Sequence, residues 1–170
     1  TKKISKVDDY ILMLARFLYS SPFVLLLLFF IPIPKLESGF WLVLSFAIIV
    51  EVLAWIFYIK SIRSAQLSLV APFLSLTPVF LVFTSFVILG ELPSFVGFFG
   101  ILMIVVGAYI LNLKNISTGI LEPFKSIFKE KSCVYMIVAA FLFSISANLG
   151  KILILKSSPL FFSAIYFPLL

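Results

Sequence analysis

The stretch that decides the fold reads APFLSLTPVFLVFTSFVILGELPSFVGFFGILMIVVGAYILN and covers residues 71–112. It belongs to two apolar runs, 67–89 and 94–113, and neither run contains a charged residue. A helix needs about 20 apolar residues to cross a bilayer, and each run is long enough. Because only residues 90–93 separate the runs, the two helices must be antiparallel neighbours. The stretch therefore predicts a transmembrane helical hairpin.

Proline and glycine residues shape this hairpin. Gly90 can end the first helix, and Pro93 suits the first turn of the second. Glu91 lies at the hairpin tip, where it either stabilises the positive end of the second helix or gates a pathway. Pro72 and Pro78 each remove a backbone hydrogen bond, which favours a kink that either packs locally or bends during function. Small residues in the second helix favour close helix packing; they are Gly97, Gly100 and Gly107.

The composition extends the membrane assignment to the whole chain. It is 63% hydrophobic and 12% charged, whereas soluble domains carry about 25% charged residues. The chain has no histidine and a single cysteine, Cys133, so we predict no disulfide, no zinc or other metal site and no cofactor. The net charge of +6 is explained by basic loops at a membrane surface and does not require nucleic acid as a partner.

Three further charge-poor runs, 10–31, 40–59 and 134–155, are each expected to form one transmembrane helix. A last apolar run begins near Pro159 and is too short at Leu170 to cross the bilayer. We therefore expect an all-α, polytopic transmembrane helix bundle in contact with the lipid bilayer. We also expect the chain to be a piece of a longer protein, whose remaining helices are its packing partners.

The longest polar connection, 114–132, separates two parts of the chain, 1–113 and 133–170. Apolar residues recur in it at helical spacing, between lysines and Glu122. This pattern indicates either a short amphipathic helix on the membrane surface or a plain linker with some helix. The apolar residues are Ile120, Leu121, Phe124, Ile127 and Phe128.

The basic residues are distributed unevenly between the two ends of the expected helices. Of the 13, nine fall on one face, three fall on the opposite face, and Arg16 lies within the first run. Cytoplasmic loops carry an excess of Lys and Arg, so the nine-residue face is expected to be cytoplasmic. That face holds Lys2, Lys3, Lys6, Lys60, Arg63, Lys114, Lys125, Lys129 and Lys131, and the other holds Lys35, Lys151 and Lys156.

Glu51 is the strongest candidate for a functional residue, because a carboxylate near mid-bilayer is costly and normally faces a bundle interior or an aqueous cavity. Trp55 and Tyr58 share its helix face and could wall a cavity or bind a cation. The alternative is a structural carboxylate, paired with a basic residue or hydrogen-bonded within the bundle. We expect Glu51 to lie on a substrate or proton pathway.

A second candidate group lies on the 134–155 helix. Ser144, Asn148 and Lys151 are spaced by four and three residues, so they share a face and could bind a polar or anionic group of a substrate. Lys151 could instead extend to the membrane surface from near the helix end. Arg16, which lies a similar distance inside its own helix, has the same two interpretations.

Residues 58–112 resemble the last part of an EamA repeat, which belongs to the drug/metabolite transporter (DMT) superfamily. The resemblance implies ten helices in two five-helix repeats of inverted topology around a central substrate cavity. Many members place both termini in the cytoplasm, which conflicts with the charge distribution above. The matching features are Pro72, the Leu76-Thr77-Pro78 step, the Gly90-Glu91 turn, and Gly97, Gly100 and Gly107.

The resemblance also implies a domain division. Residues 1–113 would form the first repeat without its first helix, 114–132 the connecting loop, and 133–170 the truncated start of the second repeat. The function implied is secondary active transport of a small metabolite or drug-like solute across the cytoplasmic membrane by alternating access, with proton coupling through Glu51 as a hypothesis. The protein would then not be an enzyme.

Two alternatives stay open at this point. A membrane-embedded enzyme that modifies lipid would need clustered carboxylates, histidine or a metal, and its activity would require a divalent ion. A membrane subunit that transports nothing would need no charge within its helices, and Glu51 and Lys151 weigh against it.

The charge distribution generates a test of orientation. In the full-length protein, single cysteines placed at Lys125 and Lys35 should be labelled from opposite sides of the membrane, with position 125 accessible only from the cytoplasm. Labelling of position 125 from outside intact cells would establish the orientation that the family resemblance implies.

Overall fold

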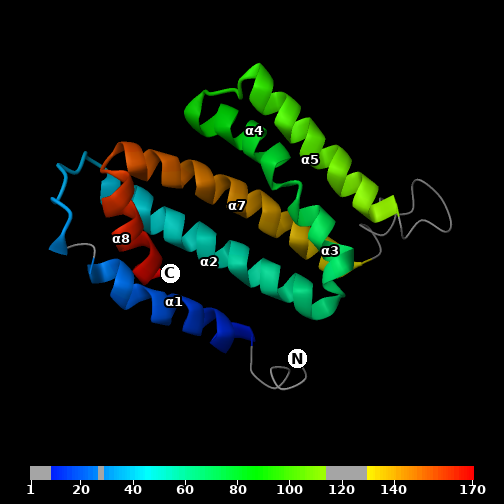
Figure 1. Cartoon of the computed structure of the whole chain (residues 1–170), viewed down its shortest axis with the longest axis horizontal. Helices are drawn as coiled ribbons and strands as arrows, with labels where there is room; N and C mark the ends of the chain where they lie inside the picture. The colour runs from blue at the N-terminus through cyan, green and yellow to red at the C-terminus, as the bar shows by residue number, and fades with distance from the viewer. Residues whose placement is uncertain (1–8, 27–28, 114–129) are drawn as a thin grey trace. The chain divides into compact units, whose positions relative to one another are not determined.

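The computed structural model describes residues 9–26, 29–113 and 130–170, and no strand occurs in that part of the chain (Figure 1). The all-α fold class predicted from the composition is therefore confirmed. The helices are α1 (Asp9–Leu26), α2 (Phe40–Ser64), α3 (Leu67–Leu74), α4 (Thr77–Leu89), α5 (Phe95–Leu113), α7 (Lys131–Leu155) and α8 (Pro159–Leu169).

A helix was expected over 10–31, and α1 is described over Asp9–Leu26. Residues 27–28 lie outside the described part, and residues 31–39 contain no helix. Pro32 and Pro34 agree with the absence of helix there, because each proline disfavours helical geometry in the residue before it. The expected helix over 40–59 is instead longer, and α2 continues to Ser64.

The expected single helix over 67–89 is wrong, since the structure divides it into α3 and α4 at Ser75 and Leu76. In a continuous helix, the N–H of residue 78 would donate to the carbonyl of Leu74, and Pro78 has no N–H. The Thr77 hydroxyl donates to that carbonyl instead, at 2.6 Å. Pro78 thus interrupts the helix at Ser75 and Leu76, although both residues keep backbone angles in the right-handed helical region.

The hairpin of α4 and α5 forms as predicted (Figure 1). Gly90 ends α4 with φ +69, in the left-handed region that favours glycine. Its N–H donates to the Phe86 carbonyl at 3.0 Å, and the Glu91 N–H donates to the Ser85 carbonyl at 3.4 Å. These bonds satisfy carbonyls that the end of the helix leaves free.

The chain divides into two units, and α2 and α7 run through both. The first unit comprises Thr1–Ile49 and Leu149–Leu170, and in it α1 contacts α8. Lys156, just after α7, donates to the Ser38 carbonyl at 2.9 Å and lies 3.6 Å from the Glu37 carboxylate. The start of α2 is thereby joined to the end of α7.

The second unit, Val50–Asn148, contains the core that positions the candidate site. Apolar side chains of α3 pack against the start of α7, with Val70 and Cys133 fully buried. The α2 and α7 helices are antiparallel here, because Ser61 donates to the Ser132 carbonyl at 2.7 Å while the Phe57 ring lies beside that of Tyr135, one turn farther along α7.

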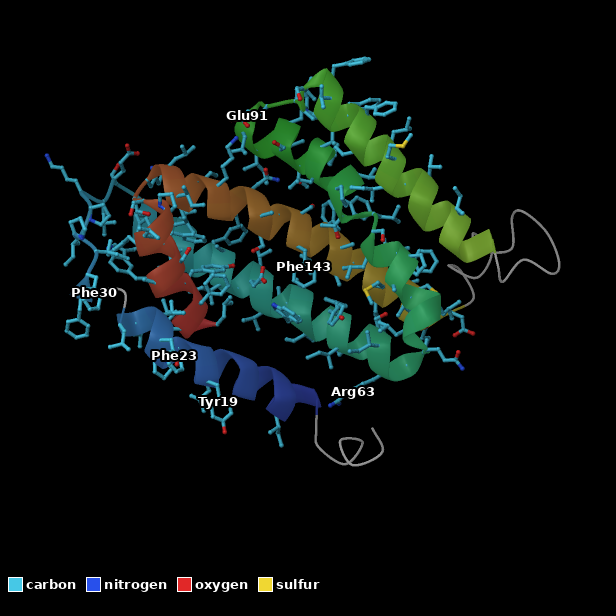
Figure 2. The ribbon with its side chains drawn as sticks, viewed as in Figure 1. Tyr19, Phe23, Phe30, Arg63, Glu91 and Phe143 are labelled. Atoms are coloured by element: carbon cyan, nitrogen blue, oxygen red, sulfur yellow. The ribbon has the colours of Figure 1, made fainter. Side chains whose placement is uncertain are left out.

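Three described stretches are long and apolar enough to cross a membrane: Phe40–Ser64, Leu69–Leu89 and Lys131–Leu155. Large apolar side chains also point outward; Tyr19 and Phe23 project from α1 and are 77% and 75% exposed (Figure 2). Such exposure fits contact with lipid, which does not penalise apolar surface. The amphipathic helix expected within 114–132 falls on residues outside the described part.

The Gly90 turn generates a stability test. A Cβ at Gly90 or at Gly100 would meet no described atom within 4 Å, but only Gly90 has a positive φ. Gly90→Ala should therefore lower the free energy of unfolding by about 1 kcal/mol, measured by denaturant unfolding in detergent. Gly100→Ala, in the interior of α5, is the matched control and should be neutral or slightly stabilising. Equal effects of the two variants would contradict the backbone argument.

Candidate functional site

The carboxylate of Glu51 lies in the middle of α2 and is held by a neighbouring indole. The Trp55 Nε1–H donates to Glu51 Oε1 at 3.0 Å, one helical turn away. The predicted sharing of a helix face by these residues therefore corresponds to a direct contact. Both side chains are half-buried, so this pair is neither sealed in the core nor fully exposed.

The Trp55 ring of this pair packs against two further aromatic rings. The Trp55 ring lies 5.4 Å from the Tyr58 ring and 5.5 Å from the Phe143 ring, at interplanar angles of 82° and 85°. Phe143 also lies 6.4 Å from Tyr58. Figure 2 labels Phe143, which comes from α7. We call Glu51, Trp55, Tyr58 and Phe143 the carboxylate–aromatic cluster.

A second group joins α4 to α7 through buried polar side chains. The Asn148 amide donates from Nδ2 to Thr84 Oγ1 at 2.9 Å and to the Ser144 carbonyl at 3.0 Å. Thr84 Oγ1 lies 3.2 Å from Ser144 Oγ. All three side chains are buried. We call Thr84, Ser144 and Asn148 the polar network.

Hydrogen-bond chemistry fixes the orientation of the Asn148 amide. A backbone carbonyl only accepts, so the amide atom that faces the Ser144 carbonyl must be the nitrogen. The same nitrogen also donates to Thr84, so both protons of the Asn148 amide are used. Asn148 Oδ1 is left as an acceptor with no hydrogen bond from any described residue.

The two groups lie at the same level along the helices. Trp55 of α2 is packed beside Phe143 of α7, and the helices are antiparallel. Glu51 lies one turn before Trp55. Because the helices are antiparallel, Glu51 is level with the turn of α7 that follows Phe143, and Asn148 comes directly after that turn. Ser144 and Phe143 are neighbours in sequence, and α7 therefore carries contacts of both groups in the same region.

The structure places the other predicted residues separately. Lys151 lies on α7 one turn beyond Asn148, with an exposed side chain, and the side chain of Arg16 is outside the described part. Glu91 is exposed in the turn after α4. A Cβ added at Gly97 would lie 3.4 Å from side-chain atoms of Pro93 and Ser94, which precede it in the chain. No described atom lies within 4 Å of such a Cβ at Gly100 or Gly107, so their role in helix packing stays a prediction.

Two contributors were missed by the sequence analysis. Thr84 lies within an apolar run and is the acceptor for Asn148, and Phe143 supplies a ring to the cluster from a different helix. A hydroxyl in the middle of a membrane span was the available signal for Thr84, because it needs a hydrogen-bond partner there. Phe143 gave no signal, being one of 21 phenylalanines.

The site offers hydrogen-bond acceptors, hydroxyls and ring faces. Groups of three or more metal-ligating His, Cys, Asp or Glu side chains are absent from the described residues. The two groups offer one carboxylate, that of Glu51, together with hydroxyl, amide and aromatic groups.

One comparison with known proteins found a match. The model of the EamA-like transporter family matches residues 1–113. No curated protein and no solved structure matches the chain. The family match covers more than half of the sequence, including α1 to α5. The chain is a multi-pass membrane protein of the drug/metabolite transporter type and belongs to the EamA-like transporter family.

Proposed function

We propose that the protein moves a small metabolite or drug-like solute across the cytoplasmic membrane by alternating access, and that Glu51 takes part in transport. The family match supports transport as the general activity. The observation that carries the role of Glu51 is its position in the middle of a membrane-spanning helix. A transporter of this kind works by binding and conformational change, without covalent chemistry on its solute.

The depth of Glu51 limits what its carboxylate can do. It lies roughly 16 Å from one end of α2 and 20 Å from the other, at 1.5 Å per residue. Its side chain is too short to reach the membrane surface from there. It must therefore be protonated, paired, or in contact with water in a cavity, and each condition suits a solute or proton pathway.

We also propose that residues 1–113 form one EamA repeat and that residues 133–170 begin a second. The family match ends at residue 113, which supports this boundary. The polar network then joins a helix of the first repeat, α4, to a helix of the second, α7. Transporters with repeated folds place their sites near the midplane at such a junction.

The break between α3 and α4 provides a hinge for alternating access. The α3 helix is held to the start of α7 by apolar packing around Val70 and Met136. The α4 helix is held farther along α7 by Thr84 and by the Phe80 ring, which lies 5.6 Å from that of Phe141. Both helices also contact α5, but their contacts with α7 are separate, so α4 can change its angle to α7 while α3 keeps its packing there. Few residues need to move at such a hinge.

The role of Glu51 is tested by Glu51→Gln in the full-length protein reconstituted in vesicles. Glutamine keeps the size and can still accept the Trp55 hydrogen bond, but it does not ionise. Expression and folding should be preserved, while transport should be abolished or should lose its dependence on pH. Glu130→Gln, the same change at an exposed acid, is the control. Wild-type rates with an unchanged pH profile would show that Glu51 is a packing residue.

The hinge is tested by Pro78→Ala, which restores an N–H four residues after the Leu74 carbonyl. The variant should favour a continuous helix over 67–89, raise the thermal stability in detergent, and slow transport several-fold. Pro93→Ala is the matched control. Pro93 was expected in the first turn of α5 but lies two residues before the helix begins at Phe95, so its missing N–H costs no helical hydrogen bond. A Pro78→Ala protein that transports at the wild-type rate would exclude bending at this position.

A further inference from the structure

No described residue would balance the charge of Glu51 in its ionised form. The Trp55 indole donates to Oε1, which orients the carboxylate but supplies no positive charge. No described Lys or Arg lies within ion-pair distance of Glu51. Its second oxygen, Oε2, receives no hydrogen bond from the described residues. An ionised carboxylate at this depth needs a positive partner.

The rings of the carboxylate–aromatic cluster could supply part of the binding energy for such a partner. Their centroids are 5.4, 5.5 and 6.4 Å apart, and the Trp55 ring is nearly perpendicular to the other two. A cation is attracted to a ring face when it lies within about 6 Å of the centroid. Rings this close together can be within that distance of one bound cation.

The polar network adds an acceptor at the same level. Asn148 uses its two protons within the network, so what it offers to a ligand is Oδ1. Glu51 likewise offers Oε2. The acceptors that remain are thus oxygen atoms, and that of Glu51 lies beside packed aromatic rings. A ligand that complements them carries N–H donors, a positive charge and an apolar surface.

We propose that this site binds an organic cation, namely a protonated amine that carries an apolar or aromatic group. The inference rests on the proposed function, because it names the substrate class of the same transporter. The Glu51 carboxylate forms the ion pair, and Trp55, Tyr58 and Phe143 contact the apolar part. An anion would be repelled by Glu51. A divalent metal ion would need more oxygen ligands than one carboxylate and one amide supply.

The test uses the full-length protein and three probes of similar size: benzylammonium, neutral benzyl alcohol and anionic benzoate. Binding is measured in detergent from the rise in melting temperature with probe concentration. Transport is measured separately in proteoliposomes. We expect benzylammonium to bind at least about tenfold more tightly than either analogue. Glu51→Gln should remove that preference, and Trp55→Leu should weaken benzylammonium binding by roughly three- to thirtyfold. The control, Glu130→Gln, should bind as the wild type does.

The two proposals fail in different ways. Equal binding of benzyl alcohol and benzylammonium, or unchanged benzylammonium binding in Glu51→Gln, would overturn the cation site. Transport of a neutral or anionic solute in the same vesicles would then leave the proposed function standing. Glu51-dependent binding of benzylammonium without transport of any probe would support the cation site and count against the proposed function.

Discussion

The constraint on which this structure depends is that the bilayer core offers no water to backbone or hydroxyl groups. A break in a helix or a buried hydroxyl is therefore costly unless it finds a partner within the protein. The serine hydroxyls of α2 and α8 illustrate this, since Ser45 donates to the Trp41 carbonyl and Ser163 to the Pro159 carbonyl. At the α3–α4 break the same constraint makes Thr77 essential, because its hydroxyl satisfies the carbonyl that Pro78 leaves free.

The features that the sequence predicted are those that depend on local pattern. Long charge-free runs indicate spans because length and polarity alone decide whether a helix can cross a bilayer. The hairpin followed from a glycine between two such runs, and Gly90 adopts the left-handed conformation that ends α4. The contact between Glu51 and Trp55 lies within one helix, so the 3.6-residue period is enough to predict it.

The features that the sequence did not predict depend on how helices rotate against one another. In soluble proteins an apolar stripe indicates the buried face, but membrane helices are apolar on all sides, so that signal is missing. The pairing of Thr84 with Asn148 and the approach of Phe143 to Trp55 therefore could not be derived from periodicity. For a related reason, we predicted a kink within 67–89 where the structure has two helices. The sequence shows that a proline removes a hydrogen bond, but whether a kink or a break results depends on the neighbouring contacts.

In this site, the polar side chains that have hydrogen-bond partners can be distinguished from those that keep an atom without one. Ser61 and Ser144 use their hydroxyl protons on carbonyls, and Thr84 accepts from Asn148, so these side chains mainly hold helices together. Glu51 and Asn148 differ, because each keeps an oxygen that no described residue engages. Leaving an acceptor unengaged inside a membrane bundle is costly unless water or a ligand meets it. Asn148 has a structural reason to be polar, because it joins α4 to α7 through Thr84. The one hydrogen bond given for Glu51 lies within its own helix, so a ligand explains the carboxylate better than folding does.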